Sequence, residues 1–134
     1  MSYKENDLVR TNEGQLAIVY KRHKAESKVL DQWFEILDKE RKGWFYIVWH
    51  LTQTAGIVPA VFAESELSLV AKLNVPQFKV GQTVRVNDLG VDLSERYKAL
   101  AGSVGTVVKV WTMQIFVVID GREEIIPIWF ADLV

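Results

Sequence analysis

The chain has 134 residues, of which 49% are hydrophobic, and its formal net charge is −1. This length suffices for one ordinary domain or two very small ones, and the balanced charge disfavours strong sequence-independent binding to nucleic acid. The absence of cysteine excludes disulfides and thiolate sites and fits a cytoplasmic protein. The polar N-terminus lacks the apolar core of a signal peptide. The sequence contains no run of about 18 apolar residues, so neither a membrane helix nor a membrane partner is expected.

The first half of the chain alternates short apolar runs with polar turns, which is typical of antiparallel β-structure. In chain order we predict two strands within residues 3–20, a charged hairpin tip at 21–28, a strand at 29–37, an aromatic strand at 44–49, a strand at 57–62, and either a helical turn or a last strand within 64–74. Pro76 closes the connection to the second half, because proline disfavours a helix directly before it.

The second half has the same character, with one long polar loop at residues 87–101. We predict strands at residues 80–86, 104–112, 115–119, 125–129 and 130–134. A short helix is expected inside the loop, with Ser94 or Asp92 at its start and Gly102 at its end.

Four blocks of the first half match four blocks of the second half in the same order, which favours an internal duplication. The paired blocks are 6–11 with 81–86, 14–19 with 102–107, 34–39 with 116–121, and 59–64 with 127–132. In this alignment the halves differ in length at residues 43–58 and 87–101. Loops tolerate insertions and often carry function, so these segments are candidate functional regions.

The predicted fold is therefore all-β, with two tandem five-stranded barrels packed together. Residues 1–73 form the first barrel and include an inserted aromatic hairpin. Residues 78–134 form the second barrel, which carries the short helix in its long loop.

The order V-G-x-x-V-R-V, a long loop, G-x-x-G-T-V-V-x-V and F-V-V-x-x-D-G resembles SH3-like small barrels. Within that group it is similar to the KOW-type modules of transcription and ribosomal proteins and to small SH3-like proteins of phages. It is also similar to the family that contains the E-type protein of photosystem I and the variable chain of ferredoxin–thioredoxin reductase. The resemblance covers residues 80–134 well and residues 6–67 more loosely.

The resemblance implies a non-catalytic binding or adaptor protein, since members of these families bind proteins, RNA or redox partners. A phage or mobile-element protein that binds and inhibits a host protein is one form of this expectation. The resemblance also makes residues 87–101 the long first loop, which lines the ligand groove in peptide-binding members. The loop residues expected at a partner are Asp92, Glu95, Arg96 and Tyr97. No ALYDY-like run is present, so recognition of proline-rich peptides is not expected.

The sequence offers no catalytic, metal or cofactor motif, and we predict a protein that is not an enzyme. The two histidines, His23 and His50, are distant in sequence, and a zinc site without cysteine would need more ligands. The adjacent acids Glu123 and Glu124 point apart on a strand, as solvated charges do. The glycines at 102 and 105 precede a strand, whereas a phosphate-binding loop opens a helix.

The aromatic strand at 44–49 is the most informative segment for binding. Alternation along a strand places Trp44 and Tyr46 on one face and Trp49 on the other. One face serves a core, and the other contacts either the second barrel or another protein, for which Trp and Tyr are common anchors. A homodimer through this surface is a further alternative.

A basic cluster supports the alternative function, a KOW-like nucleic-acid-binding protein. Its members are Lys21, Arg22, Lys24, Arg41 and Lys42. Cations beside Trp44 and Tyr46 could follow a nucleic-acid backbone while bases stack on the rings. The many acids nearby and the ordinary presence of charges at hairpin ends make nucleic acid the less favoured partner.

Overall fold

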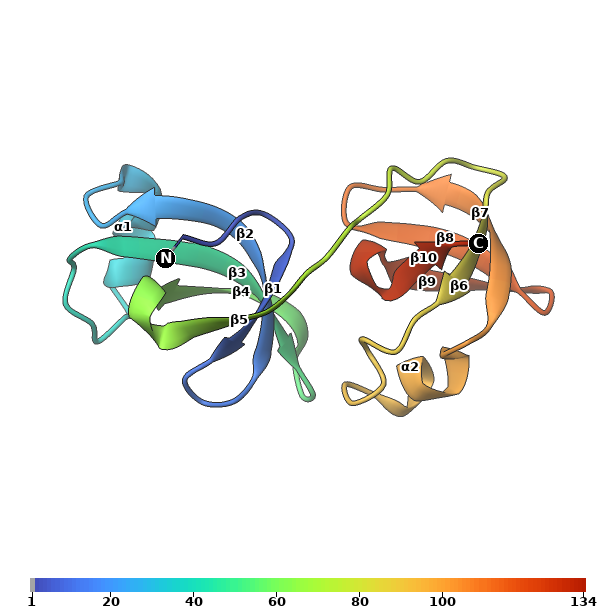
Figure 1. Ribbon diagram of the computed structural model, residues 1–134, viewed down its shortest axis with the longest axis horizontal. Helices are drawn as coiled ribbons and strands as arrows, with labels where there is room; N and C mark the ends of the chain where they lie inside the picture. The colour runs from blue at the N-terminus through green and yellow to red at the C-terminus, as the bar shows by residue number, and fades with distance from the viewer. Residues whose placement is uncertain (1) are drawn as a thin grey trace. The chain divides into compact units, whose positions relative to one another are not determined.

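The computed structural model describes residues 2–134 and divides the chain into two compact units, Met1–Leu73 and Asn74–Val134 (Figure 1). The first unit contains β1 (Asp7–Thr11), β2 (Leu16–Lys24), the 3-10 helix η1 (Lys28–Leu30), α1 (Asp31–Phe34), β3 (Trp44–Thr52), β4 (Gly56–Ala63), the 3-10 helix η2 (Glu64–Glu66) and β5 (Leu67–Lys72). The second contains β6 (Thr83–Val86), α2 (Glu95–Leu100), β7 (Val104–Val110), β8 (Gln114–Ile119), β9 (Arg122–Pro127), the 3-10 helix η3 (Ile128–Phe130) and β10 (Ala131–Leu133). The predicted all-β character is confirmed, and the expected packing of the halves on each other stays a prediction.

Each unit forms one five-stranded antiparallel sheet, and the two sheets have the same strand order. The orders are β5-β1-β2-β3-β4 and β10-β6-β7-β8-β9, so the first strand of each unit lies between its second and fifth strands. A three-residue 3-10 helix joins each fourth strand to the fifth. The described sheets are open, with the fourth and fifth strands at the edges, so the predicted closure into barrels is not seen.

Local backbone features also recur at matching places in the two units. Asn6 and Gly81 both have positive φ angles, and their amides donate to Val19 and Val107 carbonyls, each at 2.8 Å. The second strand of each unit has a β-bulge directly after an equivalent valine, which is Val19 in β2 and Val107 in β7. These positions agree with the first two blocks of the predicted repeat.

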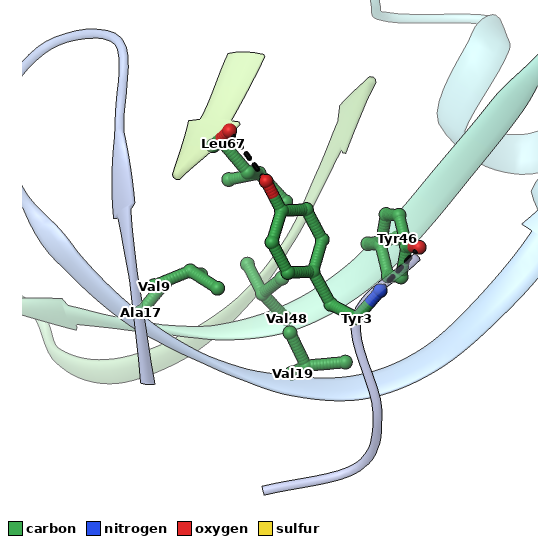
Figure 2. Packing of buried hydrophobic residues seen from close by; sticks show 7 residues of the cluster. All are labelled: Tyr3, Val9, Ala17, Val19, Tyr46, Val48 and Leu67. Carbon is green, nitrogen blue, oxygen red and sulfur yellow. Dashed lines mark hydrogen bonds between the residues drawn. The ribbon is translucent and has the colours of Figure 1, made fainter. Parts of the chain in front are cut away.

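The core of the first unit lies on one face of its sheet and is closed by Tyr3 (Figure 2). Its buried members are Tyr3, Val9, Ala17, Val19, Tyr46, Val48 and Leu67. The Tyr3 hydroxyl donates to the Leu67 carbonyl at 2.7 Å, and the Tyr3 amide donates to the Tyr46 hydroxyl oxygen at 2.8 Å. Phe78 is buried at the matching place before the first strand of the second unit.

A second apolar cluster lies on the opposite face of the same sheet, under the segment between β2 and β3. Residues 25–43 leave the sheet, form η1 and α1, and return. Ala25, Leu30, Phe45 and Val61 are buried there, with Trp33, Phe34 and Leu37 packed around them. We call residues 25–43 the covering segment.

The strand predicted at residues 29–37 is wrong, because η1 and α1 occupy this stretch up to Phe34 and a turn follows. Leu30, Trp33, Phe34 and Leu37 follow the helical spacing i, i+3, i+4 and i+7, which puts all four on the side that faces the sheet. The charged tip predicted at 21–28 is also partly wrong, since β2 continues to Lys24 and pairs with β3.

The third and fourth blocks of the predicted repeat are therefore misaligned. The strand that corresponds to β8 is β3, so the aromatic strand is a regular part of the sheet, and the inserted piece is residues 25–43 rather than 43–58. Pro59 lies inside the edge strand β4, whereas Pro127 ends β9 and caps η3. Proline is tolerated in both places for different reasons, so the matching P-x-x-F-A letters do not mark equivalent positions.

The short helix predicted in the long loop of the second unit is confirmed. α2 spans Glu95–Leu100, and the Ser94 hydroxyl oxygen accepts from the Tyr97 amide at 3.2 Å as an N-cap. Gly102 follows the helix with a φ of +84°, a conformation that suits glycine.

Candidate binding surface

The aromatic strand β3 is buried at its centre on both faces. Tyr46 is fully buried, and its hydroxyl donates to Glu64 Oε1 at 2.8 Å while it accepts from the Tyr3 amide. Burial, followed by the bond to the nearby Glu64 carboxylate, raises the pKa of Tyr46. The prediction that Tyr46 contacts a partner is therefore wrong, because the core encloses the whole side chain.

The two tryptophans of β3 are half-buried and lie near other side chains of the first unit. The Arg22 guanidinium stacks 3.6 Å from the centroid of the Trp44 ring, and Lys24 Nζ lies 5.5 Å from it. Trp49 packs against Tyr20, with ring centroids 5.8 Å apart. These contacts occupy part of each tryptophan that was predicted to meet a partner.

The predicted basic cluster is divided among structural contacts. Arg22 lies 3.6 Å from Glu64 Oε1. Arg41 donates to the carbonyls of Ala25 and Ser27 and to Asp31 Oδ1 at 2.6, 3.0 and 2.6 Å, and so holds the covering segment closed. Lys21, Lys24 and Lys42 are exposed. The five cations do not form one undivided positive patch.

The predicted loop residues of the second unit separate into two pairs. Tyr97 packs edge-on against Phe130 at 5.0 Å, and Arg96 donates to Glu124 Oε2 and to the Ile125 carbonyl at 3.0 and 2.8 Å. These two residues fasten α2 to its own unit. Asp92 and Glu95 are exposed.

An apolar patch that was not predicted from the sequence lies on β7, β8 and β9 and on the turn between β7 and β8. The bulge after Val107 places Val108 and Lys109 opposite Phe116, whose partner on β9 is Ile125. Trp111 packs edge-on against Phe116 at 4.8 Å, and Val118 follows Phe116 on the same face. We call Val108, Trp111, Phe116, Val118 and Ile125 the C-terminal patch.

The C-terminal patch is open to solvent. Trp111 is 48% exposed, and Val108 and Ile125 are each 41% exposed. Lys109 pairs with Phe116, and its Nζ lies near both aromatic rings, 4.9 Å from the Trp111 centroid and 5.4 Å from the Phe116 centroid. Scattered apolar side chains are normal on a protein surface, but a contiguous group with an exposed tryptophan is typical of a binding site.

The equivalent face of the first unit is covered. Lys21, Ile47 and Val61 pair across β2, β3 and β4 as Lys109, Phe116 and Ile125 pair across β7, β8 and β9. Val61 is 3% exposed beneath the covering segment, whereas Ile125 is 41% exposed. The alternation of residues 115–119 could have revealed the patch. Ile115, Val117 and Ile119 are buried on one face of β8, and Phe116 and Val118 lie on the other face.

One hollow of the first unit holds several charged side chains. It has a volume of about 340 Å³ and is lined by Lys39, Glu40, Lys42, Phe45, Ala63, Ser65 and Glu66. Lys39 pairs with Glu66 at 2.8 Å there, and no histidine lines the hollow. Across residues 2–134, no group of three or more His, Asp or Glu side chains is placed to hold a metal ion.

No protein-family model and no curated protein matches this sequence. In the part of the chain that the structure describes, no helix has the length and apolar character needed to cross a membrane.

Proposed function

We propose that this protein is a non-catalytic binding or adaptor module, and that the C-terminal patch is where it contacts a partner protein. The observation that carries the proposal is the difference between two equivalent sheet faces. One is sealed by the protein's own covering segment, and the other exposes Trp111 and Ile125. Trp is a frequent anchor of protein interfaces.

The fold part of the proposal is that the units are two copies of an SH3-like barrel. The shared strand order supports it, as do the 3-10 helix before the last strand and the bulges after Val19 and Val107. Each copy carries its insertion in a different loop, after β2 in the first unit and after β6 in the second. Known barrels of this kind serve mainly as binding modules, which agrees with the proposed role.

The test is site-specific crosslinking in the source cell. A photo-reactive phenylalanine analogue replaces Trp111 in the full chain, and crosslinked proteins are identified by mass spectrometry. The identified partner is then purified, and its affinity is measured for the unmodified protein and for Ile125→Glu. We expect the charge to weaken binding at least tenfold, because a carboxylate would be buried without a partner.

Val80→Glu is the matched control, since Val80 is 67% exposed in the same unit but outside the C-terminal patch. It should leave the affinity unchanged. Equal binding by Ile125→Glu and the unmodified protein would overturn the proposal, as would a crosslinking pattern no different from that of an analogue placed at Val80.

Nucleic acid is the second candidate partner, and the Arg22 guanidinium stacked on Trp44 beside Lys24 is the observation that favours it. Such a site should bind single-stranded RNA or DNA with an affinity that falls steeply with salt and drops when Arg22 and Lys24 are replaced by Gln. The carboxylates of Glu64, Glu66 and Asp31 pair with cations of the same unit, so a protein partner is better supported.

A further inference from the structure

We infer that the C-terminal patch takes a short amphipathic helix of its partner, with apolar residues spaced i, i+3, i+4 and i+7. This inference rests on the proposed function and adds the chemistry of the partner. The following contacts carry it.

The first argument is the cover that the chain itself uses on the equivalent face. In the first unit, η1, α1 and the turn after them lay Leu30, Trp33, Phe34 and Leu37 over the sheet. Phe34 meets Phe45 of β3 edge-on at 4.9 Å. A helical segment with this spacing is therefore a cover that fits a face of this geometry.

The second argument excludes the other common way to bind at a sheet, which is to add a strand at its edge. The free edge near the patch is β9, whose Ile125 carbonyl already accepts from Arg96 at 2.8 Å. Pro127 has no amide hydrogen to offer an added strand, and the charged run Arg122, Glu123 and Glu124 discourages strand pairing. A partner thus gains apolar burial on the face and little from the edge.

The third argument is the charge around the patch. Lys109 pairs across the sheet with Phe116 and holds its ammonium near the Trp111 and Phe116 rings, so it can meet an acidic residue of a bound helix. The covering segment carries such acids, Asp31 and Glu35, beside its apolar residues. A peptide with the sequence of residues 25–43 is therefore a defined probe for the proposed class of ligand.

The experiment adds this synthetic peptide to the full ¹⁵N-labelled protein and records amide chemical shifts. We expect saturable shifts on β7, β8 and β9 around the C-terminal patch, which disappear in Ile125→Glu and persist in Val80→Glu. A control peptide with Leu30→Ser and Phe34→Ser should bind at least tenfold more weakly, because two of its buried apolar side chains are lost.

No shifts at millimolar peptide, or equal shifts with the serine peptide, would overturn the helix inference. Sedimentation of the protein alone covers the other occupant: a dimer that Ile125→Glu dissociates would show that a second copy takes the face, and would also overturn it. Either result leaves the crosslinking test of the proposed function standing on its own, so the two failures can be told apart.

Discussion

The sheet face opposite the Tyr3 or Phe78 core, here called the outer face, differs between the two units although their strand order is the same. In the first unit, the chain lengthens after β2 and uses residues 25–43 to bury Phe45 and Val61. In the second unit, β7 turns directly into β8, and Phe116 receives Trp111 as a neighbour from that turn while Ile125 stays exposed. The equivalent residues Val61 and Ile125 are thus buried in one unit and exposed in the other.

The inner faces, which carry the Tyr3 or Phe78 core, are by contrast alike, because there the two units differ only by small changes of side chain. Ala17 and Gly105 follow equivalent turns and precede equivalent valines by two residues, yet one has a methyl group and the other has none. Tyr3 brings a hydroxyl to the place where Phe78 has only a ring. Variation on the inner face is limited to what the core can hold.

The largest effect is expected from opening the covering segment. Leu30→Ala removes a fully buried side chain and should destabilise the first unit by about 2–4 kcal/mol. Amide hydrogen exchange of the full chain, resolved by peptide, should show faster exchange on β3 and β4 and no change on β8 and β9.

The neighbouring Val29→Ala is the control, since Val29 is 56% exposed. It should change exchange very little. If Leu30→Ala behaved like Val29→Ala, the covering segment would not stabilise the sheet, and the contrast between covered and open faces would lose its meaning.

The next effect concerns the exchange of Ala17 for Gly105. A Cβ on Gly105 would approach Val117 Cγ1 and the Val118 carbonyl oxygen to 2.5 Å each. Gly105→Ala should therefore cost the second unit about 1–3 kcal/mol, because the core must shift to admit the methyl group. Thermal unfolding and exchange on β8 measure this loss.

The reverse substitution, Ala17→Gly, gives the first unit the residue that the second unit has at this position. It should cost the first unit only about 1 kcal/mol, through the greater backbone freedom of glycine and a small cavity. Equal costs for both substitutions would mean that the two cores are not packed differently here.

The sequence was most informative where local chemistry decides structure. Ser94 and Gly102 bound the helix in the long loop as expected, and the first two repeat blocks lie at equivalent places. The strand at residues 29–37 was wrong because a short apolar run fits either a strand or a helix, and a mistaken alignment favoured the strand. The patch was missed although residues 115–119 alternate, because whether Ile125 on β9 is covered depends on the length of the connection between β7 and β8, which the pattern of β9 does not report.

A smaller effect is expected from the tyrosine bridge of the first core, which the second core lacks. Tyr46→Phe leaves the Tyr3 amide without its acceptor and removes the hydroxyl that donates to Glu64, at a cost of about 1–2 kcal/mol. Burial raises the pKa of Tyr46 above its ordinary value of 10.0, so the folded state holds this proton more tightly than the unfolded chain. Stability from this group is present below pH 10 and is lost as the pH rises further.

Denaturant titrations between neutral pH and pH 11, a range set around the ordinary tyrosine pKa of about 10, should show this alkaline loss, and Tyr46→Phe should reduce it. The exposed Tyr20→Phe is the control and should keep both the stability and its pH dependence. A Tyr46→Phe protein as sensitive to alkali as the unmodified one would place the alkaline loss elsewhere.

The smallest effect distinguishes the units at mildly acidic pH, because His50 lies in the first unit and the second has no histidine. Burial lowers the pKa of His50 below 6.5; its ring meets Phe62 edge-on at 5.6 Å, and among residues 2–134 its buried Nε2 has no hydrogen-bond partner. The fold therefore favours the neutral ring, and as the pH falls below 6.5 the unfolded chain takes up the proton first, which destabilises the first unit.

Amide hydrogen exchange, corrected for the intrinsic rate, should accelerate more on β3 than on β8 between pH 7 and pH 5. His50→Phe should remove this difference, and His23→Gln should retain it. An equal acid response of both strands in the unmodified protein would show that carboxylates, which both units contain, cause the loss of stability at acidic pH rather than this ring.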